Sequence, residues 1–435
     1  MEQAVRRVLD LAVQHGASQA EAAVSAETGL SVTARLGDVE TLEYHSDRGV
    51  GVTVYFGQRK ASASSADLSA EALEQTVAKA VSIARYTAED PCAGLADAQL
   101  MAADLPDLDL SHPWELAPER AIELAIECEQ SARDVDKRIT NSEGASINSH
   151  QGVRVYGNSH GFLGGYPSTS HSISCAVVAS DDAGMERDYW YDSARCHDDL
   201  LTPAEIGRQA GERTVRRLGA RKIDTVTAPV LFPPELARGM IGHYLAAVRG
   251  TVQYRQASFL LDIAGQQVFP EFMQLSERPH LLRAPGSRPM DNEGVATQDR
   301  ELVADGVAQG YILSSYSARK LGLQTTGNAG GIHNLLVKPS TSGGLAELMQ
   351  QMGSGLLIGE LMGQGVNAVT GDYSRGAAGF WVEDGKISFP VHEITIAGNL
   401  RDMFRNIVAV GDDVDARGRV RCGSMLLEQM TIAGA

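Results

Sequence analysis

The sequence predicts an α+β fold with two domains, and three observations support this. In the first half, amphipathic helical segments occur beside runs in which apolar and polar residues alternate, as in antiparallel strands with one buried face. From about Thr251 onward the chain is rich in glycine and in β-like segments. This mixture favours α+β over a doubly wound α/β domain. We expect an N-terminal mixed helix and antiparallel-sheet domain at 1–223 and a C-terminal glycine-rich, β-rich domain at 224–435.

Helical segments in the first half are indicated by periodicity and by their start signals. Helices are expected at Ser69–Arg85, where Ser69 is the N-cap, at Pro118–Arg133, and at Pro203–Leu218, where proline occupies the first position. The N-terminus predicts a further amphipathic helix. Its apolar side carries Val5, Val8, Leu9, Ala12 and Val13.

Strands in the first half are indicated by alternation and by turn residues. The sequence predicts a strand over 21–37 and a hairpin over 49–65 that turns at Gly57 and Gln58. Repeated turn signals between short β-like runs over 139–180 are typical of an antiparallel meander. The stretch 90–118 is rich in Pro, Asp and Ala, and we expect it to be a surface connection.

The expected domain boundary lies near Asp224. A basic cluster comes just before it, and we interpret this cluster as a solvated helix end that complements the helix dipole. After the boundary, a strand leads into a helix at Pro234–Arg249. The basic cluster consists of Arg213, Arg216, Arg217, Arg221 and Lys222.

Composition limits the possible partners and the compartment. The net charge of −17 argues against a nucleic-acid partner, because phosphate contacts need a basic surface. No segment approaches the roughly 20 apolar residues that span a membrane, and the N-terminus lacks the features of a signal peptide. The five cysteines have no paired spacing, which favours reduced thiols and a cytoplasmic location.

The helix at 234–249 resembles a metal-binding helix but lacks its chemistry. Its one histidine is His243, and the upstream positions that would carry another ligand and a general base are Arg238 and Gly239. Zinc needs imidazole, thiolate or carboxylate donors. A guanidinium does not deprotonate to become a ligand, and glycine has no side chain.

One further motif is discounted. Residues 157–161 fit the nucleophile-elbow string G-x-S-x-G, which requires a helix directly after the serine. The following residues, FLGGYP, cannot form that helix. The string therefore does not predict a serine hydrolase.

Long segments of the second half resemble the TldD/PmbA family. Their amino-acid sequences are closer to the PmbA (TldE) branch than to TldD. The resemblance covers most of 251–435, while the N-terminal half fits in length and layout. The segments that carry it are SYSARKLGLQTTGNAGGIHN, ELMGQGVNAVTGDYSRGAAGFWVEDG, HEITIAGNLRDMFRNI and RCGSMLLEQMTIAG.

This resemblance implies a set of degenerate metal-site positions. In the family, TldD holds zinc with an H-E-x-x-x-H helix and a C-terminal cysteine, and it pairs with TldE to degrade or trim small unfolded peptides. Carried over to this chain, the first zinc histidine falls on Arg238, the catalytic glutamate on Gly239, the second histidine on His243 and the cysteine on Cys422. On a regular helix, positions 238 and 243 point about 140° apart. A shared metal would need a distortion, which Gly239 and Gly242 could permit.

The leading hypothesis is therefore a subunit without zinc of a cytoplasmic metalloprotease complex. The resemblance implies a TldD-like zinc subunit as partner, with zinc expected only in that partner, an unfolded peptide as substrate, and a homodimer when the chain is alone. Two roles remain open for Arg238: it fills the metal position or contacts a peptide or the partner, or it is a surface arginine. Cys422 is a relic, an adventitious ligand or a buried thiol. The residues expected to line the peptide chamber are His333, Asn334, Asp372, Tyr373 and Arg375.

Two alternatives stay open. One is an autonomous metallopeptidase that uses His243, Cys422 and another donor, which predicts stoichiometric zinc and activity without a partner. The other is a non-enzymatic regulator of toxin–antitoxin or gyrase-linked factors, as the family's older description as a gyrase modulator implies.

Overall fold

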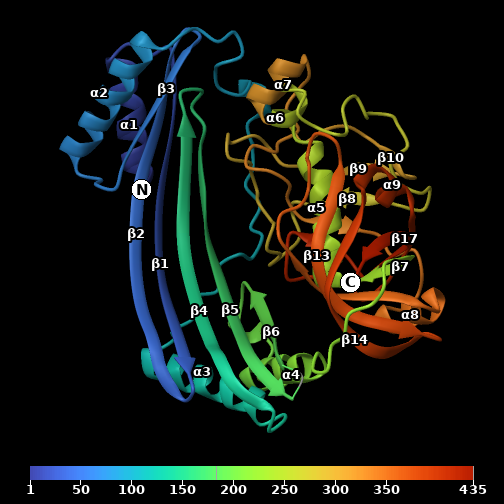
Figure 1. Ribbon diagram of the computed structural model, residues 1–435. Coiled ribbons are helices and arrows are strands. Elements are labelled where there is room, and N and C mark those ends of the chain that lie inside the picture. Colours follow the sequence, from blue (N-terminus) through green and yellow to red (C-terminus); the bar gives the residue numbers. More distant parts are fainter. Residues whose placement is uncertain (183, 435) are drawn as a thin grey trace.

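The computed structural model describes residues 1–182 and 184–434 and confirms the α+β fold. One long antiparallel sheet with four helices forms the N-terminal half (Figure 1). The C-terminal half lies beside this sheet and, in its described residues, contains two sheets of shorter strands and five helices.

The N-terminal sheet has six strands in the order β3-β2-β1-β4-β5-β6, all antiparallel. The predicted hairpin with its turn at 57–58 is confirmed. The antiparallel pairing predicted over 139–180 is confirmed, but the predicted short runs are wrong, because this segment forms two strands of 20 and 19 residues joined by a tight turn. The strands are β1 (Gln19–Arg35), β2 (Asp38–Phe56), β3 (Arg59–Ser65), β4 (Ile139–Asn158), β5 (Leu163–Asp181) and β6 (Gly184–Ala194).

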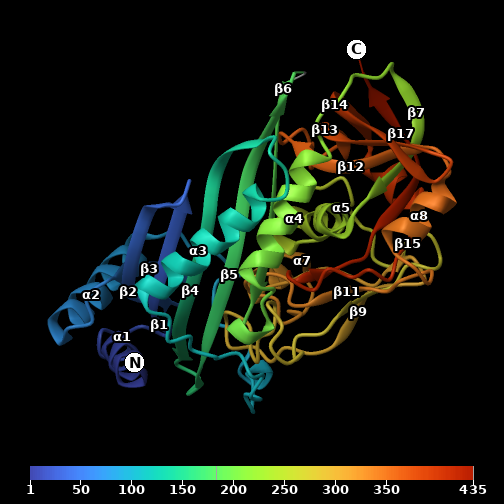
Figure 2. The same cartoon turned by 90° about the horizontal axis from the view of Figure 1, so that it is seen from below.

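Four helices cover one face of this sheet. Helices α1 (Glu2–Gln14) and α2 (Ala70–Tyr86) lie near one end of the strands, and α3 (Pro118–Arg133) and α4 (Pro203–Val215) lie near the other (Figures 1 and 2). The Ser69 side chain caps α2 as predicted, and Thr202 forms a capping box with Glu205 on α4. In α1, Leu11 is buried and Val13 is exposed, so the predicted apolar side is slightly rotated.

The two faces of the sheet differ in chemistry because side chains alternate along each strand. Even-numbered residues of β1, such as Val24 and Val32, are buried under the helices. Odd-numbered residues point to the opposite side, which we call the polar face. Its residues on β1 are Glu21, Ser25, Glu27, Ser31 and Thr33, and their cross-strand partners include Asp47, Thr53, Asn148 and Arg154.

In the C-terminal half, five strands form a closed ring in the order β14-β13-β12-β7-β17, since β14 also pairs with β17. The strand β15 (Ile407–Val410) pairs with the outer part of β17. The ring strands are β7 (Val226–Phe232), β12 (Gly355–Met362), β13 (Asp372–Glu383), β14 (Lys386–Asn399) and β17 (Met425–Ala433).

A second sheet and short helices complete this half. The sheet order is β10 (Val307–Ala308), β9 (Arg300–Ala304), β8 (Leu275–Glu277), β11 (Leu335–Val337) and β16 (Val420–Arg421). The helices are α5 (Pro234–Ala247), α6 (Gly250–Gln253), α7 (Ser315–Leu321), α8 (Leu345–Met352) and α9 (Leu400–Arg405), with 3-10 turns at Ala98–Leu100 and His197–Asp199 in the first half. The predicted strand and helix after the boundary are confirmed as β7 and α5.

The basic cluster corrects one interpretation, because all five of its members contact the C-terminal half. Arg213 pairs with Glu235 at 2.9 Å, and Arg217 pairs with Glu360 at 2.7 Å. The Arg216 guanidinium lies 4.9 Å from the centre of the Phe380 ring. Arg216, Arg221 and Lys222 are exposed as expected. The Arg221 guanidinium nevertheless lies 3.6 Å from the centre of the Phe389 ring, and Lys222 pairs with Glu393 at 2.7 Å.

The stretch 90–118 also differs from the prediction. It runs along the junction of the two halves and does not lie free on the surface, since Leu95, Leu108 and Leu110 are buried. Asp90 accepts a hydrogen bond of 2.6 Å from Tyr316 and pairs with Lys320 at 2.9 Å. Among the described residues, no helix has the length and apolar character needed to cross a membrane.

Two glycine-to-alanine substitutions test this packing, because one is expected to destabilise the folded protein and the other to stabilise it. A Cβ on Gly207 of α4 would lie 2.0 Å from the carbonyl oxygen of Cys128 on α3, so Gly207→Ala is expected to destabilise the protein by about 1–3 kcal/mol. Gly239 on α5 is exposed with no atom near its Cβ position, so Gly239→Ala is expected to stabilise by about 1 kcal/mol. Urea unfolding followed by circular dichroism measures both, and equal shifts of the two midpoints would contradict this packing.

Candidate functional site

Helix α5 carries three of the four predicted metal-site positions, and it is a regular α-helix. It begins directly after Pro233, has proline at its first position, and runs without interruption from 234 to 247. Its buried side packs into the C-terminal core through Met240, Ile241 and Tyr244. Since no bulge interrupts the helix, the side chains at 238 and 243 leave it in different directions.

Arg238 reaches across the junction to the N-terminal sheet. Its guanidinium donates a hydrogen bond of 2.8 Å to the Tyr191 hydroxyl on β6 and lies 3.5 Å from a carboxylate oxygen of Asp415. Arg417 also pairs with Asp415, at 2.9 Å, and donates to the backbone oxygen of Tyr191 at 2.6 Å. Arg238 is therefore part of a network that connects α5, the 415–417 loop and β6.

Asp415 is charged within this network. Burial alone would raise the pKa of Asp415, but hydrogen bonds from Arg417 and the charges of Arg417 and Arg238 lower this pKa below its usual value. Two guanidinium groups thus share one buried carboxylate.

His243 lies in a different environment on the other side of α5. Its ring contacts the ring of Tyr373 edge-on, with 5.8 Å between the ring centres. Burial lowers the pKa of His243, and the nearby charge of Arg375 lowers it further. The imidazole is therefore neutral near pH 7.

Cys422 follows β16 and is fully buried. Its thiol donates to the carbonyl oxygen of Gly423 at 3.2 Å. Burial raises the pKa of Cys422 to about 12, with smaller contributions from the charges of Asp413 and Asp415. In this environment, without a metal, the Cys422 thiol is protonated at neutral pH.

These four positions do not fit the donor set of a zinc site. Arg238 offers only N–H donors and is engaged by Asp415 and Tyr191. Gly239 has no side chain, and Cys422 is a neutral thiol whose hydrogen points at a carbonyl. His243, whose ring faces Tyr373, and Cys422 are the two positions of ligand type, fewer than the three protein ligands usual for catalytic zinc.

The predicted chamber residues separate into two groups. Tyr373 and Arg375 project from β13 to the side of His243, while Asp372 points away and accepts hydrogen bonds from Thr370 and Asn399. His333 and Asn334 are buried elsewhere.

His333 and Asn334 support the fold through a buried carboxylate and the loops around it. His333 lies 2.8 Å from Glu277, and Asn334 donates to Ser287 at 2.7 Å. Burial alone would raise the pKa of Glu277, but His333 and Arg300 lower it to about 2. Both predicted residues are engaged in the internal hydrogen bonds of the C-terminal half.

A cavity of about 570 Å³ lies between the polar face and loops of the C-terminal half. Glu21 accepts hydrogen bonds from Tyr55 at 3.1 Å and from Tyr156 at 2.9 Å. Across the cavity, Arg154 donates to Asn292 at 2.6 Å. Its lining further includes Thr53, Ser62, Ser64, Glu293, Ser314 and Gly330.

These cavity residues, together with Tyr191, Asp415 and Arg417, were not predicted from the sequence. The alternation along β1 is the signal that could have placed Glu21 on an open face. The sequence held no signal for its neighbours across the cavity, because strand register and the docking of the two halves bring them together.

Comparisons with known proteins identify the class. Models of the PmbA/TldA metallopeptidase family match residues 20–84 as domain 1, 111–218 as the central domain and 225–434 as the C-terminal domain. The chain belongs to this family. The first two segments together form the single N-terminal sheet.

The relatives place the chain in the PmbA branch. Metalloprotease PmbA of Escherichia coli O157:H7 is 54% identical over 437 residues, which cover 100% of this chain and 96% of that protein. A PmbA homologue of Haemophilus influenzae is 51% identical over 434 residues, which cover 100% of this chain and 96% of that protein.

Solved structures share the fold. A proposed modulator of DNA gyrase from Bacteroides thetaiotaomicron superposes with a TM-score of 0.94 and 28% identity, with 100% of this chain and 98% of that chain covered. TldE of Thermococcus kodakarensis superposes with a TM-score of 0.87 at 20% identity, covering 99% of this chain and 100% of that chain.

The environment of His243 can be tested by titration. Because burial and Arg375 both disfavour the imidazolium, His243 should titrate below 6.5, the ordinary histidine pKa. Protonation costs more in the folded state, so the contribution of His243 to stability is complete above pH 6.5 and falls as the pH drops below it. Arg375→Gln should raise the pKa of His243 only part of the way, since burial is the larger cause.

Histidine NMR signals measured against pH, assigned with His243→Ala, check this prediction. A His243 pKa at or above 6.5 in the unmodified protein would contradict the burial described here.

Proposed function

We propose that this chain is the non-catalytic PmbA/TldE-type subunit of a cytoplasmic metallopeptidase complex. In this proposal a TldD-type subunit holds the zinc ion and supplies the general base, and the complex degrades or matures small unfolded peptides. This chain shapes the chamber that holds the peptide, and alone it forms a homodimer. Family membership and the PmbA relatives support the class of reaction.

The observation that carries the proposal is the engagement of Arg238. The resemblance to TldD implies a zinc ligand at this position, whereas here the guanidinium pairs with Asp415 and Tyr191. A cation fixed at this point repels a metal ion and joins the two halves of the chain. The helix that serves catalysis in a TldD-type subunit thus serves assembly in this one.

The cavity against the polar face is our candidate for the peptide-binding part of the chamber. It offers a carboxylate at Glu21 and a guanidinium at Arg154, with hydroxyl groups around them. Such groups can bind the backbone and the termini of a peptide without selecting one sequence. This candidate replaces His333 and Asn334, whose side chains bind other parts of the fold.

The central experiment measures cleavage of a fluorescent unfolded peptide by this chain, by a TldD-type subunit from the same organism, and by their mixture. We expect cleavage by the mixture alone. Replacing a zinc-ligating histidine of the TldD-type subunit should abolish it, whereas His243→Ala in this chain should leave the rate within about twofold. A mixture no faster than the TldD-type subunit alone would refute the proposal.

Narrowing the cavity should weaken peptide processing. Ser64 is exposed on β3 and lines the cavity, so Ser64→Trp should lower kcat/KM of the mixture on the order of tenfold, or about 1.4 kcal/mol. Thr41→Trp is the matched control, because Thr41 is an exposed residue of the same sheet outside the cavity lining. Equal kcat/KM values for the two variants would remove the cavity from the proposed chamber.

The two alternatives make distinct predictions. An autonomous metallopeptidase built on His243 and Cys422 predicts cleavage by this chain alone and its loss in His243→Ala. A non-enzymatic regulator predicts that the mixture never cleaves, and the similarity to a proposed gyrase modulator is the observation that favours testing it.

A further inference from the structure

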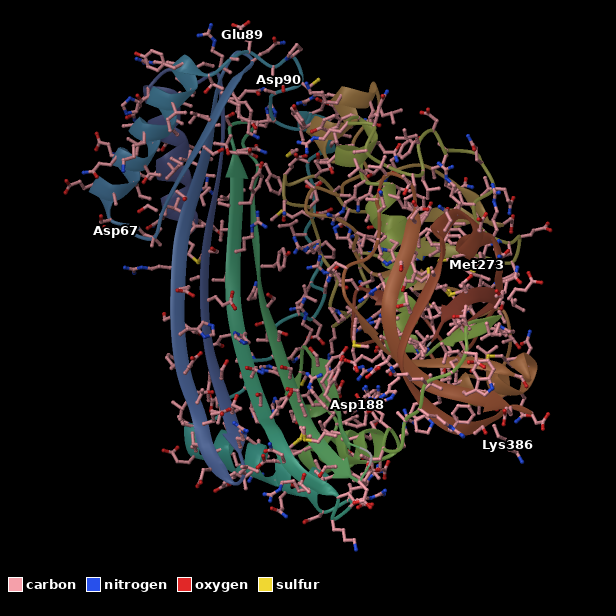
Figure 3. All side chains as sticks on the ribbon, viewed as in Figure 1. Asp67, Glu89, Asp90, Asp188, Met273 and Lys386 are labelled. Atoms are coloured by element: carbon pink, nitrogen blue, oxygen red, sulfur yellow. The ribbon has the colours of Figure 1, made fainter. Side chains whose placement is uncertain are left out.

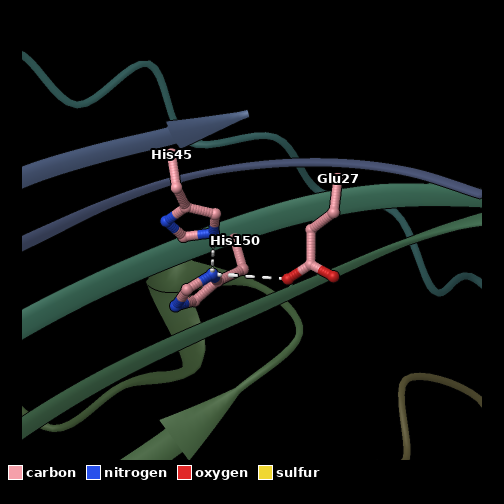
Figure 4. A group of neighbouring side chains, drawn as sticks. All are labelled: Glu27, His45 and His150. Carbon is pink, nitrogen blue, oxygen red and sulfur yellow. Dashed lines mark hydrogen bonds and ion pairs between the residues drawn. The ribbon is translucent and has the colours of Figure 1, made fainter. Parts of the chain in front are cut away.

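We propose that Glu27, His45 and His150 form a binding site for a divalent transition-metal ion of the zinc class on the polar face. This site is separate from α5, and neither the family match nor the proposed function assigns it. The three residues come from the three neighbouring strands β1, β2 and β4 (Figure 4).

The spacing of the three donors fits a metal ion. The Nδ1 atom of His150 lies 3.2 Å from Nε2 of His45 and 3.5 Å from a carboxylate oxygen of Glu27. All three donor atoms lie within 4.8 Å of one another. Two donors that each bind a tetrahedral ion at about 2.1 Å are about 3.4 Å apart, so little movement is needed for all three to bind one ion.

Strand register produces this arrangement, and a glycine makes it possible. His45 and His150 both pair with Gly29, one from each side of β1, and Glu27 lies two residues away on the same face. A Cβ on Gly29 would come within 2.3 Å of the His45 ring and 2.6 Å of the His150 ring. Glycine weakens a central strand, and its presence here leaves space for two imidazoles above the backbone.

The donor set decides the class of ion. Two imidazoles and one carboxylate are ligands that Zn²⁺ and its first-row neighbours accept, whereas Mg²⁺ and Ca²⁺ prefer oxygen ligands. Glu27 is exposed and both histidines are partly exposed, so solvent can complete the coordination. Asp47, directly opposite Glu27 on β2, adds a negative charge nearby.

The site faces the same side of the sheet as the cavity. Glu21 and Glu27 lie six positions apart on β1, which corresponds to about 20 Å along the strand. A metal bound here therefore does not occupy the peptide cavity. It also lies on the N-terminal sheet, whereas α5 belongs to the C-terminal half. Metal binding and the proposed function can consequently fail independently.

The test is zinc binding by the purified full-length chain after chelator treatment, measured by equilibrium dialysis and elemental analysis. We expect one Zn²⁺ per chain. His45→Ala, His150→Ala and Glu27→Gln should each weaken binding by at least about 100-fold, because even the loss of groups that only orient metal ligands costs 10–100-fold. His15→Ala, at an exposed histidine outside the cluster, should bind as the unmodified chain does.

Two further measurements separate metal ligation from a simple hydrogen-bonded histidine pair. Gly29→Ala keeps all three ligands but fills the space under the rings, so it should also lose zinc. Zn²⁺ should raise the melting temperature of the unmodified chain but not of His150→Ala, and Mg²⁺ should raise neither. The melting temperatures without metal show whether each variant is folded.

Two results would overturn the inference. Absence of Zn²⁺ binding by the folded, unmodified chain would leave only a hydrogen-bonded cluster. Zinc that persists in His150→Ala but disappears in His243→Ala or Cys422→Ser would place the metal at α5, and would refute the proposed non-catalytic role as well.

Discussion

The structure depends on the pairing of β1 with both β2 and β4 at the centre of one long antiparallel sheet. This register sends even-numbered residues of β1 under four helices and odd-numbered residues to the polar face. It places Glu21 beside Tyr55 and Tyr156 at the cavity, and Glu27 beside two histidines further along (Figure 4). Side chains of the sheet and of the C-terminal half meet between the two halves (Figure 3). A shift of one residue would exchange the two faces and destroy both arrangements.

The junction between the halves is held mainly by arginines. Arg213 on α4, Arg217 just after α4 and Arg238 on α5 each pair with a carboxylate across the junction or beside it. Arg417 adds stacking, with its guanidinium 4.5 Å from the ring centres of Trp190 and Tyr191. Removing one partner from a largely buried charge pair destabilises a protein much more than removing one partner from an exposed pair. The surface of α5 that carries Arg238 thus has a structural use in this chain.

Local chemistry made much of the fold predictable. Ser69, Pro118, Pro203 and Pro234 mark helix starts that the structure confirms, and the 57–58 turn fixes the first hairpin. Long-range effects were not predictable. The burial of Arg217, the path of 90–118 along the junction and the meeting of His45 with His150 all depend on docking or register between distant segments. The α5 residues could be compared with the family in sequence, but only the structure shows that Arg238 and His243 contact different neighbours.

The central claim is that α5 of this chain does not act as a metal helix and that catalysis belongs to a TldD-type subunit. The most direct test is an anomalous difference map, recorded at the zinc absorption edge, of crystals of the complex. The account predicts a zinc peak at the metal helix of the TldD-type subunit and none beside His243 and Cys422 of this chain. A zinc peak between those two residues would contradict it.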